Sequence, residues 1–247
     1  MVQLSSLMQS PQAIPAALTF TALIDSALCV GAGGSSGSLA DKPILRNAQQ
    51  QLVIPGSQLK GRLRHECEKL ASALGWPICE SPSPTTMCPQ RLGLDEACFS
   101  QKTSYDIGKR NINGDIQRHC LICQIFGNPS LASRIEVDDL VCQVEPDNLP
   151  EVLRPGVTLN RRRRTAEDQK LYFLETSPVN VQLPFTGNIY LEPACPLQTK
   201  PLLLAALHHI HALGGSKSAG LGWLRWQFPE QTIDDGDWTS LLEAKTS

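Results

Sequence analysis

The chain has 247 residues, of which 41% are hydrophobic, and its formal net charge is −2. A chain of this length can bury a full core without a partner, in one elaborated domain or two small ones. The charge argues against a general nucleic-acid coat protein, which usually carries a basic excess over a whole face, so any phosphate binding must be local. We find no membrane-span pattern and no signal-peptide pattern, which predicts a cytoplasmic protein without a membrane partner.

The N-terminal half begins with a predicted strand and a predicted helix. Residues 17–30 have a partly alternating, β-rich pattern and lead into a loop of small residues. Pro55 and Gly56 turn the chain, and we expect Ser57 to be the N-cap of an amphipathic helix that Gly75 ends. Regular periodicity then fades, which predicts an irregular insertion.

The C-terminal half completes an α+β pattern. The predicted elements are a strand at 134–145, a polar arm at 151–184, a strand at 183–192, a helix at 201–213 and a strand at 221–228. This order is compatible with a ferredoxin-like, RNA-recognition-type sheet packed on two helices. We expect a single domain over residues 15–229, with insertions at about 76–124 and 151–184 and a polar tail at 230–247.

Two segments combine Gly and Ser with cationic side chains at the edge of a predicted helix. They are IPGSQLKGRLRHE at residues 54–66 and LGGSKSAGLG at residues 213–222. Backbone N–H groups, hydroxyls and cations can converge there on a run of phosphates. The candidate ligands are Ser57, Lys60, Arg62, Arg64 and Lys217. The structural alternatives are a capped helix with a solvated basic face and a flexible helix-to-strand turn.

The polar arm carries four consecutive arginines, Arg161, Arg162, Arg163 and Arg164. An extended arm would project these guanidinium groups to both sides, where they can contact phosphates or stack on bases. Tyr172 and Phe173 lie close enough in sequence to add stacking surface. The alternative is a solvated charge run on a disordered loop.

The chain contains nine cysteines, and in a cytoplasmic protein a cluster of them indicates metal binding rather than disulfides. Cys120 and Cys123 have the two-residue spacing that suits a tetrahedral zinc ion. We favour Cys79 and Cys88 as the other ligands of a structural zinc in the irregular insertion; Cys98, Cys67 and His119 are held in reserve. One alternative is a redox pair, which normally opens a helix after a strand, a context not apparent here. Another is a set of ordinary buried thiols, the role expected for Cys29, Cys142 and Cys195.

Four segments carry a further signal: IPGSQLKGRLR, CLICQIFGNPSLASRIEVDDL, GVTLNRRRRTAEDQKLYFLET and LGGSKSAGLGWL, the first beginning at Ile54 and the last ending at Leu224. In this order they resemble the RAMP superfamily of CRISPR proteins, most closely the repeated backbone subunit of type III effector complexes. The resemblance spans the chain from Ala17 to Phe228. The arginine run is heavier than the usual pattern of the family. The Ser/Gly loop before the expected aspartate is also unusually long.

The resemblance implies roles for particular residues. The two glycine-containing segments would hold the backbone of a guide CRISPR RNA through Ser57, Lys60, Arg64, Lys217 and Ser218. The arginine-bearing arm would be the thumb that displaces bases at regular intervals. Asp41, which taken alone fits a solvent-facing turn aspartate, matches the cleaving aspartate of the family.

We therefore expect a subunit that polymerises along a guide RNA with other RAMP subunits and cleaves a paired target RNA at each displaced nucleotide. Asp41 would act as a general base or hold Mg²⁺ or another divalent cation, which makes the protein a metal-dependent endoribonuclease. The main alternative is a non-cutting RNA-binding scaffold of the same complex. A guide-processing nuclease with a histidine base is a weaker alternative, because the Gly-rich loop has no histidine. A small metal-dependent redox protein is weaker still, because only the CLIC motif suggests it.

Overall fold

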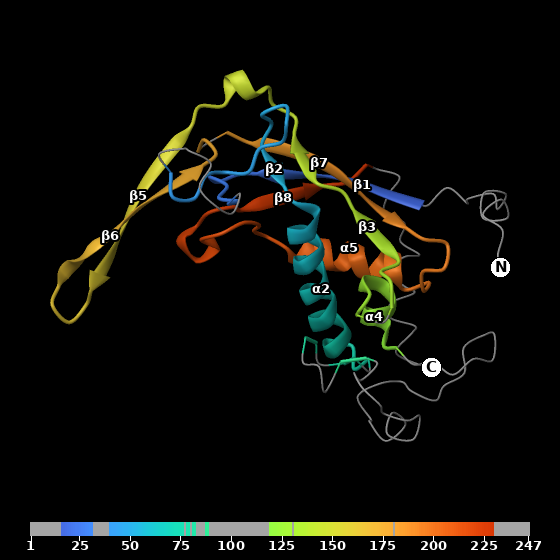
Figure 1. The fold of residues 1–247 in the computed structure, drawn as a ribbon. Helices are drawn as coiled ribbons and strands as arrows, with labels where there is room; N and C mark the ends of the chain where they lie inside the picture. Colours follow the sequence, from blue (N-terminus) through green and yellow to red (C-terminus); the bar gives the residue numbers. More distant parts are fainter. Residues whose placement is uncertain are drawn as a thin grey trace, which may run out of the picture.

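A six-stranded antiparallel sheet forms the centre of the structure (Figure 1). The structure is a computed structural model that describes residues 16–31, 40–76, 78–79, 81–82, 87–88, 119–129, 131–179 and 181–229. The strands of this sheet are β1 (Ala16–Ile24), β2 (Val53–Ile54), β3 (Ile135–Val137), β4 (Leu140–Cys142), β7 (Leu183–Leu191) and β8 (Leu224–Gln227). Their order is β2-β4-β7-β1-β8, and β3 pairs with another part of β7.

Buried and more exposed residues alternate along the two central strands, β1 and β7. β1 and β7 pair over their whole length, from Ala16 opposite Leu191 to Ile24 opposite Leu183. Every second residue of β7 is buried, and β1 buries its matching positions, so that Phe20 and Phe185 are fully buried core side chains. Side chains of successive strand residues point to opposite faces, which explains why one face of this sheet is apolar.

Three helices cover that apolar face: α2 (Gly56–Ala73), α4 (Leu121–Phe126) and α5 (Thr199–His209) (Figure 1). Helix α2 buries Leu59, Leu63 and Cys67 on one side. It packs against α5, and the Cys67 thiol donates a hydrogen bond to the carbonyl of Leu202 at 3.8 Å. Antiparallel strands with helices on one face confirm the predicted α+β class.

Helix α2 is capped from a distant loop rather than by its own sequence. The prediction that Ser57 is the N-cap was wrong, because the helix begins at Gly56 and Pro55 holds the cap position. The Gly56 N–H donates to Oδ1 of Asp139 at 2.7 Å, so the loop between β3 and β4 supplies the acceptor. The predicted end is confirmed: the helix stops at Ala73, and Gly75 follows with a φ of +74°.

A long antiparallel hairpin extends away from the sheet and helices (Figure 1). It consists of β5 (Val152–Asn160) and β6 (Thr165–Thr176), and we call it the arm. It occupies most of the polar segment predicted at 151–184. Several apolar side chains of the arm, including Leu159 and Leu171, are exposed.

Two predicted elements differ from the observed ones. The strand predicted at 134–145 is two short strands, β3 and β4, interrupted at Asp138 and Asp139. The helix predicted at 201–213 ends at His209. The chain becomes extended there, since the Leu224 N–H donates to the carbonyl of His211 at 3.0 Å and Leu213 pairs with Gly222. Most of the Ser/Gly loop, much of the 76–124 insertion and the tail at 230–247 lie outside the described residues.

Candidate functional site

A cavity of about 510 Å³ lies where the arm joins the sheet and helices. Its walls come from the segment after β1, the start of α2, the base of β6 and the segment after α5. The lining residues are Cys29, Val30, Gly31, Lys42, Pro55, Gln58, Tyr172, Leu174, Gly214, Gly215 and Ser216. The two glycine-containing segments identified in the sequence therefore line one cavity, although they come from opposite ends of the chain.

The C-terminal glycine segment is held directly against the segment after β1. Gly214 has a φ of +89°, and a Cβ at this position would lie 2.6 Å from the carbonyl oxygen of Cys29. The Gly215 N–H donates to that same oxygen at 2.7 Å. Glycine is therefore required here, because a side chain would push the segment away from the cavity wall. Lys217 and Ser218 follow in an exposed 3₁₀ helix (Lys217–Ala219).

The segment that begins at Asp41 runs beside β6 at the base of the arm. The Asp41 N–H donates to the carbonyl of Phe173 at 3.0 Å, and the Glu175 N–H donates to the carbonyl of Lys42 at 3.1 Å. Adjacent residues of an extended segment project to opposite sides. In agreement, Lys42 lines the cavity and Asp41 does not.

Lys42 is a candidate ligand that the sequence analysis missed. Its side chain is exposed and lines the cavity together with the glycine segment. The only signal in the sequence was its position directly after the candidate aspartate. Its position next to a candidate functional residue does not show whether the side chain of Lys42 lines the cavity.

The carboxylate of Asp41 is attached to the arm on one side. Its Oδ2 accepts a hydrogen bond from the Phe173 N–H at 2.7 Å, and the residue is exposed. Within the described part of the chain, Oδ1 accepts no hydrogen bond. Asp41 can therefore anchor the base of the arm and still present one oxygen to a substrate proton or a cation.

A buried carboxylate holds the same junction together. Glu175 is 5% exposed, and its Oε2 accepts a hydrogen bond from the Ile44 N–H at 3.0 Å. Its other oxygen, Oε1, pairs with Arg46 at 3.4 Å. The negative charge of the buried Glu175 is therefore compensated by these two partners. The same contacts fix the base of β6 to the segment that carries Asp41.

The cations of α2 contact partners inside the protein. The Lys60 ammonium donates to Oγ of Ser133 at 2.7 Å and to the carbonyl of Ile135 at 3.2 Å, and burial lowers the pKa of Lys60. Arg62 forms an ion pair with Glu66 at 2.9 Å. Neither residue lines the cavity, and neither does the exposed Ser57; the start of α2 reaches the cavity through Pro55 and Gln58.

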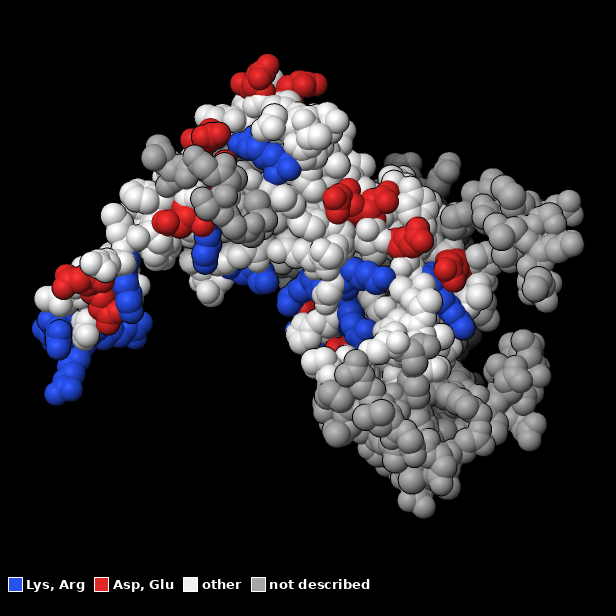
Figure 2. Space-filling model, viewed as in Figure 1, with Lys and Arg blue, Asp and Glu red and all other residues white. Residues whose placement is uncertain are grey.

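The four arginines of the arm lie in the turn at its tip rather than along an extended strand. Oδ1 of Asn160 accepts hydrogen bonds from the N–H groups of Arg162 and Arg163, both at 3.1 Å. The Arg164 N–H donates to the carbonyl of Asn160 at 2.7 Å. All four arginines are exposed, and Figure 2 shows Lys and Arg gathered at this tip. The turn therefore concentrates positive charge at the distal end of the arm.

Four buried thiols form a second candidate site. The Sγ atoms of Cys79, Cys88, Cys120 and Cys123 all lie within 4.8 Å of one another. Cys79 is 3.4 Å from Cys123 and 3.6 Å from Cys120. Zinc–sulfur bonds of about 2.3 Å place the sulfurs of a tetrahedral site about 3.8 Å apart, so this geometry fits one zinc ion. The structure brings together the four cysteines that the sequence analysis favoured.

The local structure explains how the pair Cys120 and Cys123 is presented. Cys120 is the N-cap of α4, and Cys123 lies one turn inside the helix. A short helix therefore follows the motif, but within the described residues no strand directly precedes it, so the strand-then-helix context of a redox pair is not observed. Two additional thiols distinguish the site from a two-cysteine redox pair. A hydrogen bond from Cys120 lowers the pKa of the Cys123 thiol, which favours the thiolate that metals bind.

The reserve ligands do not join the cluster. Cys67 is buried between α2 and α5, and His119 is not a member of the four-thiol group. Cys98 lies outside the described residues. The predictions that Cys29 and Cys142 are buried are confirmed, whereas Cys195 is only partly buried.

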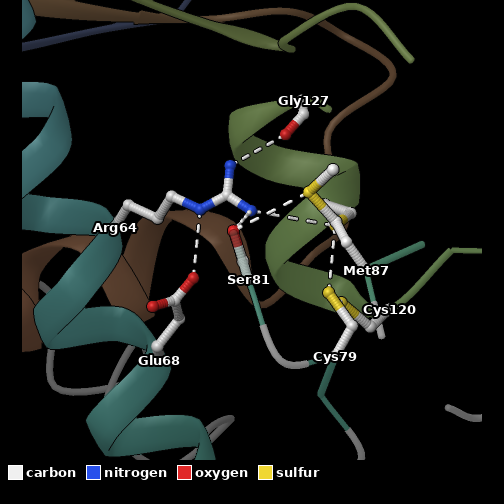
Figure 3. Close-up of polar contacts among 8 residues, drawn as sticks. Arg64, Glu68, Cys79, Ser81, Met87, Cys120 and Gly127 are labelled. Atoms are coloured by element: carbon white, nitrogen blue, oxygen red, sulfur yellow. Dashed lines mark hydrogen bonds and ion pairs between the residues drawn. The ribbon is translucent and has the colours of Figure 1, made fainter. Parts of the chain in front are cut away.

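Arg64 of α2 lies beside this cluster (Figure 3). Its Nε donates to Glu68 at 3.0 Å, and its Nη1 donates to the carbonyl of Gly127 at 2.9 Å. Its Nη2 donates to Oγ of Ser81 at 3.2 Å and to Sγ of Cys123 at 3.9 Å. Arg64 therefore faces the cysteines rather than the cavity.

Comparison with known proteins gives one family. The model of the RAMP superfamily matches residues 22–225, a range that includes the cavity, the arm and the cysteine cluster. No curated protein gives a significant match. None of the helices in the described ranges is both long and apolar enough to span a membrane.

Proposed function

Because this chain belongs to the RAMP superfamily, we propose that it is a guide-RNA-binding backbone subunit of a type III CRISPR ribonucleoprotein that cleaves paired target RNA. Membership supports the coarser role, an RNA-binding subunit of a CRISPR complex. The observation that carries the finer role is the shared cavity, because it gathers two glycine-containing segments and the base of the arm around one space.

The cavity offers the contacts that a ribonucleotide backbone needs. Lys42 supplies a cation for a phosphate, and the segment from Gly214 to Ser216 allows close approach of the RNA backbone. Tyr172 adds an aromatic ring on which a base can stack. Lys217 and the adjacent Ser218 extend this surface from the exposed 3₁₀ helix.

The residues of the first turns of α2 have a smaller part in this proposal. Ser57 is exposed and available to a phosphate. Lys60 and Arg62 bind RNA only if they give up their present partners, Ser133 and Glu66.

The arm has the shape and charge of the proposed thumb. Its exposed apolar side chains, such as Leu159 and Leu171, can insert between bases, and its tip carries four guanidinium groups that can contact phosphates. Displacement of one nucleotide would open the paired strand at the base of the arm, where Asp41 lies.

The proposed cleavage is an in-line attack within the target strand. The 2′-hydroxyl of the displaced ribose attacks the neighbouring phosphorus, the bond to the 5′-oxygen breaks, and the products carry a 2′,3′-cyclic phosphate and a 5′-hydroxyl. Asp41 would take the proton of the 2′-hydroxyl as general base through the oxygen that is not bound to Phe173. In the alternative role, the same oxygen would instead hold a divalent cation such as Mg²⁺, which would stabilise the developing negative charge.

We further propose a ferredoxin-like core and a structural zinc. The order β8-β1-β7-β4, with α2 after β1 and α5 after β7, agrees with the β-α-β-β-α-β pattern of that fold. The four thiols would hold the zinc and tie the irregular insertion to α4. Under this proposal residues 15–229 form one domain.

Two substitutions of Asp41 separate catalysis from anchoring. Asp41→Asn keeps an oxygen that can accept the hydrogen bond from Phe173 but removes the base, whereas Asp41→Ala removes both. Each variant is assembled with guide RNA and its partner subunits, and target RNA is added with magnesium. We expect both variants to bind target RNA and Asp41→Asn to cut about 10² to 10⁴ times more slowly than wild type.

The outcomes decide between two functions. If the Asp41→Asn complex cleaved target RNA at the wild-type rate, Asp41 would be rejected as the base. If only the Asp41→Ala complex lost activity, the residue would act only by positioning the arm. The scaffold alternative is favoured by one observation, namely that the Asp41 carboxylate already accepts a backbone hydrogen bond from Phe173. A wild-type complex that binds target RNA without producing regularly spaced products would establish that alternative.

A further inference from the structure

We propose that Arg64 is a positioning residue of the cysteine metal centre and not a ligand of RNA. The inference rests on the zinc proposed above. It reassigns a side chain that the sequence predicted to contact phosphates, and it identifies which part of α2 serves the metal centre.

The guanidinium group joins three separate parts of the chain at the cluster (Figure 3). It binds Glu68 on its own helix, the carbonyl of Gly127 at the end of α4, and Ser81 in the segment that follows Cys79. The fourth hydrogen bond goes to the sulfur of Cys123 at 3.9 Å. One planar group therefore fixes two ligand-bearing segments relative to α2.

The charge of Arg64 suits a metal centre of this composition. Four thiolates around one Zn²⁺ carry a net charge of about −2, and a hydrogen bond to a ligand sulfur spreads that charge. The cluster is buried, so the cost of its charge falls if a cation lies beside it. Ion pairing of Arg64 with Glu68 keeps the guanidinium oriented.

The same contacts leave little of Arg64 for a phosphate. Its side chain is 22% exposed, and all three of its nitrogen atoms donate to protein acceptors. A fork that is already engaged in this way binds an anion only if several hydrogen bonds break. Arg64 also lies outside the cavity lining.

Arg62 provides a matched control on the same helix. It forms an equivalent ion pair four residues along, with Glu66 at 2.9 Å, and its side chain is 30% exposed. The structure shows no contact between Arg62 and the described cysteines. A substitution there removes the same charge from α2 without touching the metal centre.

The test compares Arg64→Gln, Arg64→Lys and Arg62→Gln in the full chain purified with zinc. We expect wild type and Arg62→Gln to release zinc to a colorimetric chelator at the same rate and Arg64→Gln to release it about 10 to 100 times faster. Arg64→Lys keeps the charge but loses the planar fork, so its rate should lie between them. In Co²⁺-substituted protein, the visible absorption bands should shift in Arg64→Gln alone, which a general loss of stability would not produce.

Three results would overturn the inference. Arg64→Gln could hold zinc as firmly as wild type with an unchanged cobalt spectrum, which would remove Arg64 from the centre. Zinc-loaded Arg64→Gln could bind RNA more weakly than zinc-loaded wild type, which would return Arg64 to RNA binding. Wild type could also contain no zinc, which would reject the metal centre itself while the RNA-binding proposal remained intact.

Discussion

The arm tip gives the sharpest prediction about RNA binding. We consider the quadruple replacement of Arg161, Arg162, Arg163 and Arg164 by alanine. All four residues are exposed, and the turn that carries them is held by Asn160, which the replacement leaves in place. The variant should therefore fold as wild type does, and its far-ultraviolet circular dichroism and melting temperature check this.

The magnitude follows from counterion release. Each phosphate neutralised on a single strand contributes about −0.7 to the slope of log Kobs against log salt concentration, so four contacts contribute about −2.8. Between about 50 mM and about 200 mM salt, wild type should lose about 50-fold more affinity than the variant, because log salt rises by about 0.6 over this range.

The assay is fluorescence anisotropy of a labelled single-stranded RNA titrated at several salt concentrations. Lys69→Ala is the control, since this lysine is 54% exposed and lies toward the end of α2 away from the cavity. Its slope should match that of wild type. An unchanged slope in the quadruple variant would refute the reasoning and leave the arginine run as a solvated turn.

Three further predictions concern stability. Asp139→Ala removes the acceptor for the Gly56 N–H at the start of α2 and should lower the free energy of unfolding in urea by about 0.5–2 kcal/mol, whereas Asp139→Asn should retain most of it. Cys123→Ser should abolish the proposed single zinc per chain, measured by elemental analysis, and lower the melting temperature; zinc retention at the wild-type level would contradict the ligand set. The hydrogen bond from Arg225 lowers the pKa of Asp25, so this pair stabilises the fold above the ordinary aspartate pKa and loses its effect as the pH falls through the lowered value. Arg225→Ala should therefore lower the melting temperature at neutral pH, and the difference from wild type should vanish in acid; a difference independent of pH would contradict the pairing.

Local patterns predicted the elements well where a single physical rule governed them. The alternation of 183–192 produced β7 because its two faces meet different environments, and the end of α2 followed from the freedom of Gly75 to adopt a positive φ. The cysteine set was accessible because metal ligands need a fixed chemistry and close spacing. The first two rules depend on residues close together in sequence, whereas the cysteine set was predicted from the shared chemistry of residues as far apart as Cys79 and Cys123.

Prediction failed where a distant residue changed the outcome. Ser57 has the side chain of a good cap, but Asp139 reaches the first helical N–H instead. Lys60 fits a phosphate-binding pattern and that prediction stands, but nothing in the surrounding sequence showed that Ser133 would accept a hydrogen bond from this lysine. Lys42 was overlooked because its role depends on the β6 strand beside it.

The sequence alone determined the α+β class, the family and the four candidate metal ligands, since residue type and order carry that information. Only the tertiary structure decided which cations face the cavity and which face the protein. The physical reason is that a helix distributes consecutive residues around its axis, and the surfaces that pack against it then select their partners. In this way the packing of α4 and the insertion directed Arg64 to the cysteines, and the pairing with β6 brought Lys42 to the cavity.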